Sequence, residues 1–351
     1  MDKKTPNPRR RTSLKDLARE LGVSIATVSR ALRSSPEIGR EMQQRVKELA
    51  KLRNYRPNPF AQSLRREAPK ILGVVVPHLE THYYAAVLAG IEAEAARAGY
   101  SVISANSHED FEAEARALDN FVSMHVEGII ACLTQTTTDY RHFEEVSDMG
   151  IPLVFFGRTC LPEKFSSVKA SGDVAAQQAT QHLIDTGSRR IAFVGGPNHL
   201  DMVRRRKHGY LEALRDNRLP ILREMVVCGN IDYQWALEQT TRLLQRDDRP
   251  DAILAFNDII TFAAFTAIKQ LHLRIPEDVA LIGFTDDVHA AYVTPQLSAI
   301  EDRSHQIGST ACRMLLRHIG GDRTIYHDIV PQKLVIRETS AKKNEKEKIT
   351  F

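Results

Sequence analysis

The sequence predicts an α/β protein with a three-helix helix-turn-helix domain at its N-terminus, then a hinge, then a two-lobed core of doubly wound parallel sheets. Two short amphipathic helices flank a turn at Gly22-Val23, as is typical of the helix-turn-helix motif. Prolines at 57 and 59 interrupt the chain, and eight apolar runs then alternate with helix-length segments. Eight strands exceed one comfortable sheet, so we expect two lobes with a ligand-binding cleft at the carboxyl ends of the strands.

The helix-turn-helix spans residues 14–34. Its first helix has an apolar face made of Leu14, Leu17, Ala18 and Leu21. Gly22 permits the tight turn, and Ser24 stands where an N-cap should open the second helix. The second helix returns Val28, Ala31 and Leu32 to the first, and its other face carries Ser24, Thr27, Ser29 and Arg30. Small hydroxyls suit phosphate oxygens and a guanidinium suits guanine, so this helix is predicted to read bases.

The charge distribution supports DNA binding. Residues 1–68 hold 17 Lys+Arg against 7 Asp+Glu, a net of +10 in a chain whose total is +4, so the other 283 residues carry about −6. Cationic side chains placed on phosphates release counterions. A lone basic run is more often a solvated helical face, but the helix-turn-helix spacing favours DNA binding here.

The rest of the chain is predicted in order. A third helix, marked by Ile38, Met42, Val46, Leu49 and Leu52, completes the small domain. The segment after the prolines is too short to be a stable helix alone, so we expect it to order only with a partner and DNA. The eight strands are ILGVVVP, SVISAN, GIIACL, PLVFFG, RIAFVGGP, MVVCGN, AILAFND and VALIGFTD. The expected divisions are a flexible basic N-terminus (1–11), the helix-turn-helix domain (12–57), the hinge (58–69), the core (70–340, with lobe one about 70–166 and 298–327 and lobe two about 167–297 and 328–340) and a disordered charged tail (341–351).

Composition and motifs weigh against other classes of protein. No signal peptide or membrane span is apparent, so we expect a cytoplasmic protein. Four scattered cysteines, Cys132, Cys160, Cys228 and Cys312, imply neither disulfide nor zinc site. An enzyme on a doubly wound sheet is one alternative, but Gly195-Gly196-Pro197 lacks the spacing of a dinucleotide loop and no phosphate-loop, HExxH or GxSxG motif occurs. We expect no cofactor and no metal. A periplasmic binding protein, the other alternative, would need a signal peptide and would not use a basic helix-turn-helix.

The chain resembles the lac repressor (LacI/GalR) family of bacterial transcription regulators over nearly all of residues 12–340. The resemblance rests on the order and spacing of GVSIATVSRAL, NYRPNPFAQSL, HLIDTGSRRIAFVGGP, RRKHGY, PDAILAFND, IPEDVALIGF and PQLSAI. It implies a periplasmic-binding-protein-like core and a sequence-specific regulator, most often a repressor, that is controlled by a small-molecule effector. It also implies a homodimer on a near-palindromic operator. No heptad tail follows the core, which favours a dimer over a tetramer.

The resemblance implies roles for particular residues in DNA binding. Ile25 and Ala26 match the base-contacting pair, and because both are apolar they would contact groups such as thymine methyls, leaving Arg30 to recognise guanine. The phosphate-contacting positions are Ser13, Ser24, Thr27 and Ser29. Leu64 matches a leucine that wedges into the minor groove, with Ala61 beside it. An ordinary helix-packing leucine is the alternative, although the neighbours of Leu64 are polar.

For the effector, the resemblance implies Tyr84, Arg206 and Asn257 as contacts. Two positions that carry acids in the family are Thr285 and Gly157 here, with Asp286 and Arg158 next to them. Two arginines and the loss of both acids favour an anionic ligand, either an acidic or phosphorylated sugar or a similar carboxylate. Each residue has a plainer alternative: core packing for Tyr83 and Tyr84, a solvated cluster for Arg206 with Arg204, Arg205 and Lys207, and simple helix capping for Asn257-Asp258.

Overall fold

A computed structural model describes residues 12–55, 69–285 and 288–341 of the 351-residue chain. It divides into two compact units, residues 1–69 and 70–351. The predicted hinge lies outside the described residues except for Pro69, as does the charged tail except for Ala341. None of the described helices has the length and hydrophobicity of a transmembrane segment.

Within residues 12–55 the N-terminal unit forms three helices, as predicted: α1 (Leu14–Leu21), α2 (Ile25–Leu32) and α3 (Arg40–Leu52). Gly22 ends α1 in the left-handed conformation, with φ of 68°, where a side chain would be strained. The three helices bury a small apolar core of Leu17, Ala18, Val28, Ala31, Val46 and Ala50. This core fixes which face of α2 remains exposed.

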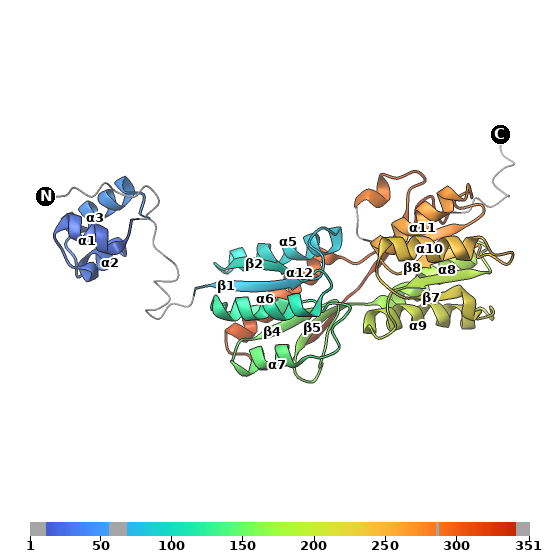
Figure 1. The fold of residues 1–351 in the computed structure, drawn as a ribbon, viewed down its shortest axis with the longest axis horizontal. Coiled ribbons are helices and arrows are strands. Elements are labelled where there is room, and N and C mark those ends of the chain that lie inside the picture. Colours follow the sequence, from blue (N-terminus) through green and yellow to red (C-terminus); the bar gives the residue numbers. More distant parts are fainter. Residues whose placement is uncertain (1–11, 56–68, 286–287, 342–351) are drawn as a thin grey trace. The chain divides into compact units, whose positions relative to one another are not determined.

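Lobe one is a six-stranded parallel sheet in the order β11-β5-β4-β3-β1-β2. Its strands β1, β2, β4 and β5 are labelled in Figure 1. Its strands are β1 (Ile71–Val76), β2 (Ser101–Asn106), β3 (Gly128–Ala131), β4 (Leu153–Phe156), β5 (Ser166–Ala170) and β11 (His327–Val330). Its helices are α5 (His82–Arg97), α6 (Phe111–Ser123), α7 (Arg141–Asp148) and α12 (Ser304–Ile319). Helices α5 and α12 pack together, as do α6 and α7, and separate apolar clusters behind them show that both faces of the sheet are covered.

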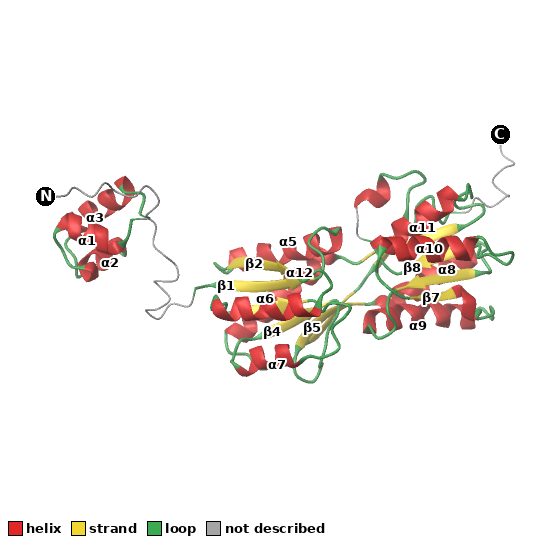
Figure 2. Cartoon of the chain, viewed as in Figure 1, coloured by secondary structure: helices red, strands yellow, loops and turns green. Residues whose placement is uncertain are grey.

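Lobe two repeats this architecture with the order β12-β10-β9-β8-β6-β7, in which β12 pairs antiparallel and the other described pairs are parallel. Figure 2 shows its strands, with β7 and β8 labelled, between helices. Its strands are β6 (Ile191–Gly195), β7 (Val226–Cys228), β8 (Ala252–Ala255), β9 (Ala280–Phe284), β10 (Ser298–Glu301) and β12 (Lys333–Val335). Its helices are α8 (Gly172–Asp185), α9 (Asp201–Asp216), α10 (Tyr233–Leu244) and α11 (Asp258–Gln270), with short 3-10 turns at Arg223–Met225 and Val288–Ala291. All eight strands predicted from apolar runs are present.

The residues at which the chain crosses between the lobes differ from the predicted lobe boundaries. The first crossing was expected at 166/167, but β5 still pairs with β4, so the chain leaves lobe one after Ala170. Strand β10 was assigned to lobe one and instead pairs with β9 in lobe two, whereas β11 extends lobe one to Val330. The error has a physical cause: β5 and β11 read SSVKA and HDIV, and these polar sequences lack the apolar run that marked the predicted strands. Three crossings thus connect the lobes.

Candidate functional site

The exposed face of α2 carries the residues expected to read DNA. Ser24 caps the helix by accepting a hydrogen bond from the Thr27 N–H at 3.0 Å, and Ser13 caps α1 in a capping box with Asp16. Ile25 is 45% exposed, and Ala26, Thr27 and Ser29 are half-buried. These caps hold the two serine hydroxyls at helix N-termini, where the partial positive charge favours phosphate oxygens.

Arg30 has a partner that the sequence did not suggest. Its Nη1 donates to Glu37 Oε2 at 2.9 Å, across the connection between α2 and α3. Both side chains are more than half exposed, so the pair stabilises the domain by less than about 1 kcal/mol. A guanidinium held this weakly can exchange the carboxylate for a base edge. Ala61 and Leu64 lie outside the described residues.

A cavity of about 60 Å³ lies between the two lobes of the core. Its walls are formed by segments that follow the carboxyl ends of strands in both sheets, which is where open α/β sheets bind ligands. Its lining is Thr81, Tyr83, Tyr84, Cys132, Arg158, Met202, Arg206, Phe256, Asn257, Phe284, Thr285 and Asp302, together with His78, Ile231, Asp258 and Ile259. The last four and Thr81 also line an outer compartment of about 440 Å³, which forms the mouth of the site.

The cavity brings together four of the five residues predicted for the effector, namely Tyr84, Arg158, Arg206 and Asn257. The fifth, Asp286, lies outside the described residues. Tyr84 is 7% exposed and belongs both to the core of lobe one and to the cavity wall, so packing in the core does not remove it from the cavity. Burial raises the pKa of its phenol well above 10 and that of the adjacent Cys132 thiol to about 11, so both groups stay protonated.

Arg206 is the most constrained charge in the cavity. It is 3% exposed, which excludes the alternative of a solvated cluster with its neighbours on α9. Its Nη2 donates to Asp302 Oδ1 at 3.1 Å and its Nη1 to the Phe256 carbonyl, while the guanidinium carbon lies 3.8 Å from the centre of the Phe284 ring. Burial lowers the pKa of the guanidinium, and the charge of Asp302 opposes that shift.

Arg158 is neutralised in the same manner. Its Nη1 donates to both carboxylate oxygens of Glu109, at 2.8 and 2.7 Å, and to the Leu133 carbonyl at 3.1 Å. Glu109 is 8% exposed. Because each cavity arginine already faces a buried carboxylate, the two arginines no longer give a reason to expect an anionic effector. Paired arginines and carboxylates instead offer donors and acceptors without net charge.

Asn257 both caps a helix and lines the cavity. Its Oδ1 accepts a hydrogen bond from the Ile260 N–H at 3.0 Å and so caps α11, while the residue also lines the cavity. The cap engages the oxygen, so the amide Nδ2 is the atom suited to a ligand. Thr285, which stands where the family has an acid, also lines the cavity.

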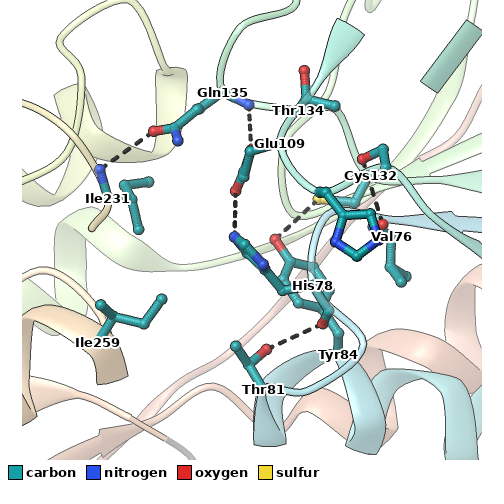
Figure 3. A network of polar contacts seen from close by, with 12 residues as sticks. Val76, His78, Thr81, Tyr84, Glu109, Cys132, Thr134, Gln135, Ile231 and Ile259 are labelled. Carbon is teal, nitrogen blue, oxygen red and sulfur yellow. Dashed lines mark hydrogen bonds and ion pairs between the residues drawn. The ribbon is translucent and has the colours of Figure 1, made fainter. Parts of the chain in front are cut away.

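Sequence reasoning missed Glu109, Asp302 and His78. Figure 3 shows Glu109 facing His78, with Nε2 and Oε1 3.6 Å apart, and facing the backbone of Gln135. Glu109 lies 49 residues from Arg158, and Asp302 lies 96 from Arg206. No local sequence pattern connects residues so far apart. The sequence offered one indication of a site role for them, which is that each follows the carboxyl end of a strand: β1 for His78, β2 for Glu109 and β10 for Asp302.

Comparisons with known proteins identify relatives of both the N-terminal domain and the core. The sequence profile described as "Bacterial regulatory proteins, lacI family" matches residues 13–58, and that of the "Periplasmic binding protein-like domain" matches residues 180–340. Catabolite control protein A of Priestia megaterium is 30% identical over 332 residues, covering 93% of this chain and 98% of that protein. The ribose operon repressor of Bacillus subtilis (strain 168) is 32% identical over 305 residues, covering 87% and 90%.

Among solved structures, the transcriptional regulator CelR in complex with cellobiose is similar, with a TM-score of 0.71, 26% identity, and coverage of 94% of this chain and all of that one. The predicted fold class, a helix-turn-helix region followed by two parallel-sheet lobes, is confirmed. The relatives are transcription regulators, so this chain is a DNA-binding regulator and not an enzyme. Motif order, fold and full-length similarity together show that the chain belongs to the lacI family of bacterial regulatory proteins.

Proposed function

We propose that this regulator reads its operator with α2 and is controlled by a neutral, polyhydroxylated effector, a sugar, held between the lobes of the core. Arg30 is assigned to guanine and Ile25 and Ala26 to apolar contacts such as thymine methyls. Ser13, Ser24, Thr27 and Ser29 are assigned to phosphates. Ala61 and Leu64 keep their proposed place in the minor groove on the strength of the family resemblance.

The buried pair of Arg206 and Asp302 is the observation that carries the choice of effector. It presents a donor and an acceptor side by side in a cavity that also contains the Asn257 amide. Hydroxyl groups both donate and accept, so a sugar satisfies such a pair, whereas a carboxylate or phosphate would oppose the charge of Asp302. Two similar proteins, a ribose operon repressor and a regulator solved with cellobiose, carry sugars in their names.

The core supplies a means of control. Three chain crossings connect the lobes, so a ligand held between the two sheets alters how the lobes close on each other. We propose a cytoplasmic homodimer in which this change shifts the population of the DNA-competent state. Affinities for effector and operator are then reciprocally coupled.

A thermal-shift screen of neutral sugars, sugar acids and sugar phosphates tests the proposal. At 100 times its Kd a ligand stabilises the folded state by about 2.7 kcal/mol, a shift of several degrees. We expect neutral sugars to give this shift, and the same screen with operator DNA gives the sign of the coupling. Arg206→Met should abolish the shift, while Arg204→Ala, an exposed neighbour on the same helix, should retain it. Stabilisation by sugar acids or phosphates alone would contradict the choice of effector.

A further inference from the structure

One residue of lobe one makes two hydrogen bonds to lobe two, and one of them reaches Ile231, which lines the effector cavity. Gln135 follows β3, and its side-chain Oε1 accepts from the Ile231 N–H at 3.3 Å (Figure 3). Its backbone carbonyl accepts from His199 Nε2 at 2.7 Å. Ile231 precedes α10 and His199 precedes α9, so the two bonds reach separate connections of lobe two.

Glu109 anchors Gln135 from within lobe one. The Gln135 N–H donates to Glu109 Oε2 at 2.5 Å, and the Thr136 hydroxyl donates to the Glu109 carbonyl at 2.9 Å. Glu109 adopts φ of 57°, a left-handed conformation that side-chain-bearing residues seldom take. This strained backbone is held by its surroundings and directs a buried carboxylate between Gln135 and Arg158, and Arg158 lines the cavity.

We propose that Glu109 and Gln135 form a latch that couples occupancy of the effector cavity to closure of the lobes. The coupling rests on the proposed function of the cavity, whereas the latch itself is defined by the two hydrogen bonds that Gln135 makes to lobe two. A ligand that accepts a hydrogen bond from Arg158 competes with Glu109 for the guanidinium. Any adjustment of the Glu109 carboxylate moves the Gln135 backbone, and with it both bonds to lobe two. Glu109 is therefore a positioning residue that acts through its neighbours.

The chain contains its own reporter for this latch. Trp235 is its single tryptophan and is half-buried at the start of α10. The indole packs directly on Gly229, where an added Cβ would lie 2.2 Å from a ring atom. Gly229 is two residues from Ile231, the residue bonded to Gln135. Release of the latch should admit solvent to this segment and increase quenching of Trp235 fluorescence by acrylamide.

The experiment compares full-length Gln135→Ala with the wild type, in the absence of effector and DNA. A neutral hydrogen bond contributes roughly 1 kcal/mol, which corresponds to about a fivefold shift in the equilibrium between closed and open lobes. We expect faster quenching and a red-shifted emission in the variant. Gln181→Ala is the matched control, because Gln181 is bonded to Asp185 and Asn217 within lobe two. Unchanged quenching in Gln135→Ala, or an equal change in Gln181→Ala, overturns the latch.

Two further variants test the arrangement. His199→Ala removes the second bond from an exposed position of lobe two and should also increase quenching, without a risk to the core of lobe one. Glu109→Gln should increase quenching at least as much as Gln135→Ala, because Glu109 positions both bonds, and the double variant should show little more than Glu109→Gln alone, which already loosens the side-chain bond that Gln135→Ala removes. Fully additive effects would show that Glu109 does not act through Gln135. Since no DNA is present, failure of the latch and failure of operator binding are separate outcomes.

Discussion

Removing the carboxylate of Asp302 should strongly destabilise the core, because it leaves the Arg206 guanidinium buried without its counter-charge. The two side chains are 3% and 8% exposed, and their atoms are 3.1 Å apart. Loss of one partner from such a pair costs about 3–5 kcal/mol, since the remaining charge stays desolvated. Stacking on Phe284 at 3.8 Å and on Phe256 at 4.9 Å is retained and contributes about 2 kcal/mol, so we expect Asp302→Ala near the lower end of that range.

Urea unfolding of a double-mutant cycle measures this. Asp302→Ala and Arg206→Met should each lower the free energy of unfolding by about 3 kcal/mol, and the double variant should lose far less than the sum of the two. Asp248→Ala is the control, because its pair with Arg246 is about half exposed and should change stability by less than about 1 kcal/mol. Additive single losses, within about 0.5 kcal/mol, would refute the view that the two charges stabilise each other.

Three other predictions concern separate parts of the molecule. Arg30→Ala should lower discrimination between operator and random duplex by about 1–3 kcal/mol in an anisotropy titration, whereas Lys51→Ala, on α3, should leave discrimination unchanged; equal selectivity in Arg30→Ala would remove its assignment to guanine. Iodoacetamide should label Cys132 at least about 100-fold more slowly than an ordinary thiol at neutral pH, because burial raises its pKa from 9.0 to about 11. Rapid modification of Cys132 in the native protein, located by mass spectrometry, would contradict this. Gly308→Ala should destabilise the core by several kcal/mol in urea unfolding, since the new Cβ would lie 2.0 Å from the Val87 carbonyl of the facing helix α5, and a neutral effect would show that α5 and α12 can separate without cost.

The helix-turn-helix could be predicted almost completely because its determinants are local. Gly22 requires a left-handed turn, Ser24 caps the next helix, and the apolar positions repeat at helical spacing within 21 residues. The ion pair of Arg30 with Glu37 could not be predicted, because Glu37 lies beyond the end of α2 and the path of the connecting segment sets the distance between the two side chains.

In the core, likewise, some strands could be predicted from local sequence and others depend on distant pairing. Central strands of parallel sheets read as apolar runs, and eight strands were visible in the sequence, while β5, β11 and β12 carry more polar residues and β10 was assigned to the other lobe; the place of all four depends on pairing with strands already formed. Their pairing also decided where the chain crosses between lobes, which the sequence misplaced by about four residues.

By itself, the sequence determined the class of the protein, the order of its domains and four residues of the cavity, because helix periodicity, apolar strands and motif spacing are local properties. Only the tertiary structure decided the charge state of that cavity. The acids that neutralise its arginines, Glu109 and Asp302, come from distant connections that meet only after both sheets have formed. A buried charge must be balanced by whatever the fold brings next to it, and that neighbour is set by topology rather than by position along the chain.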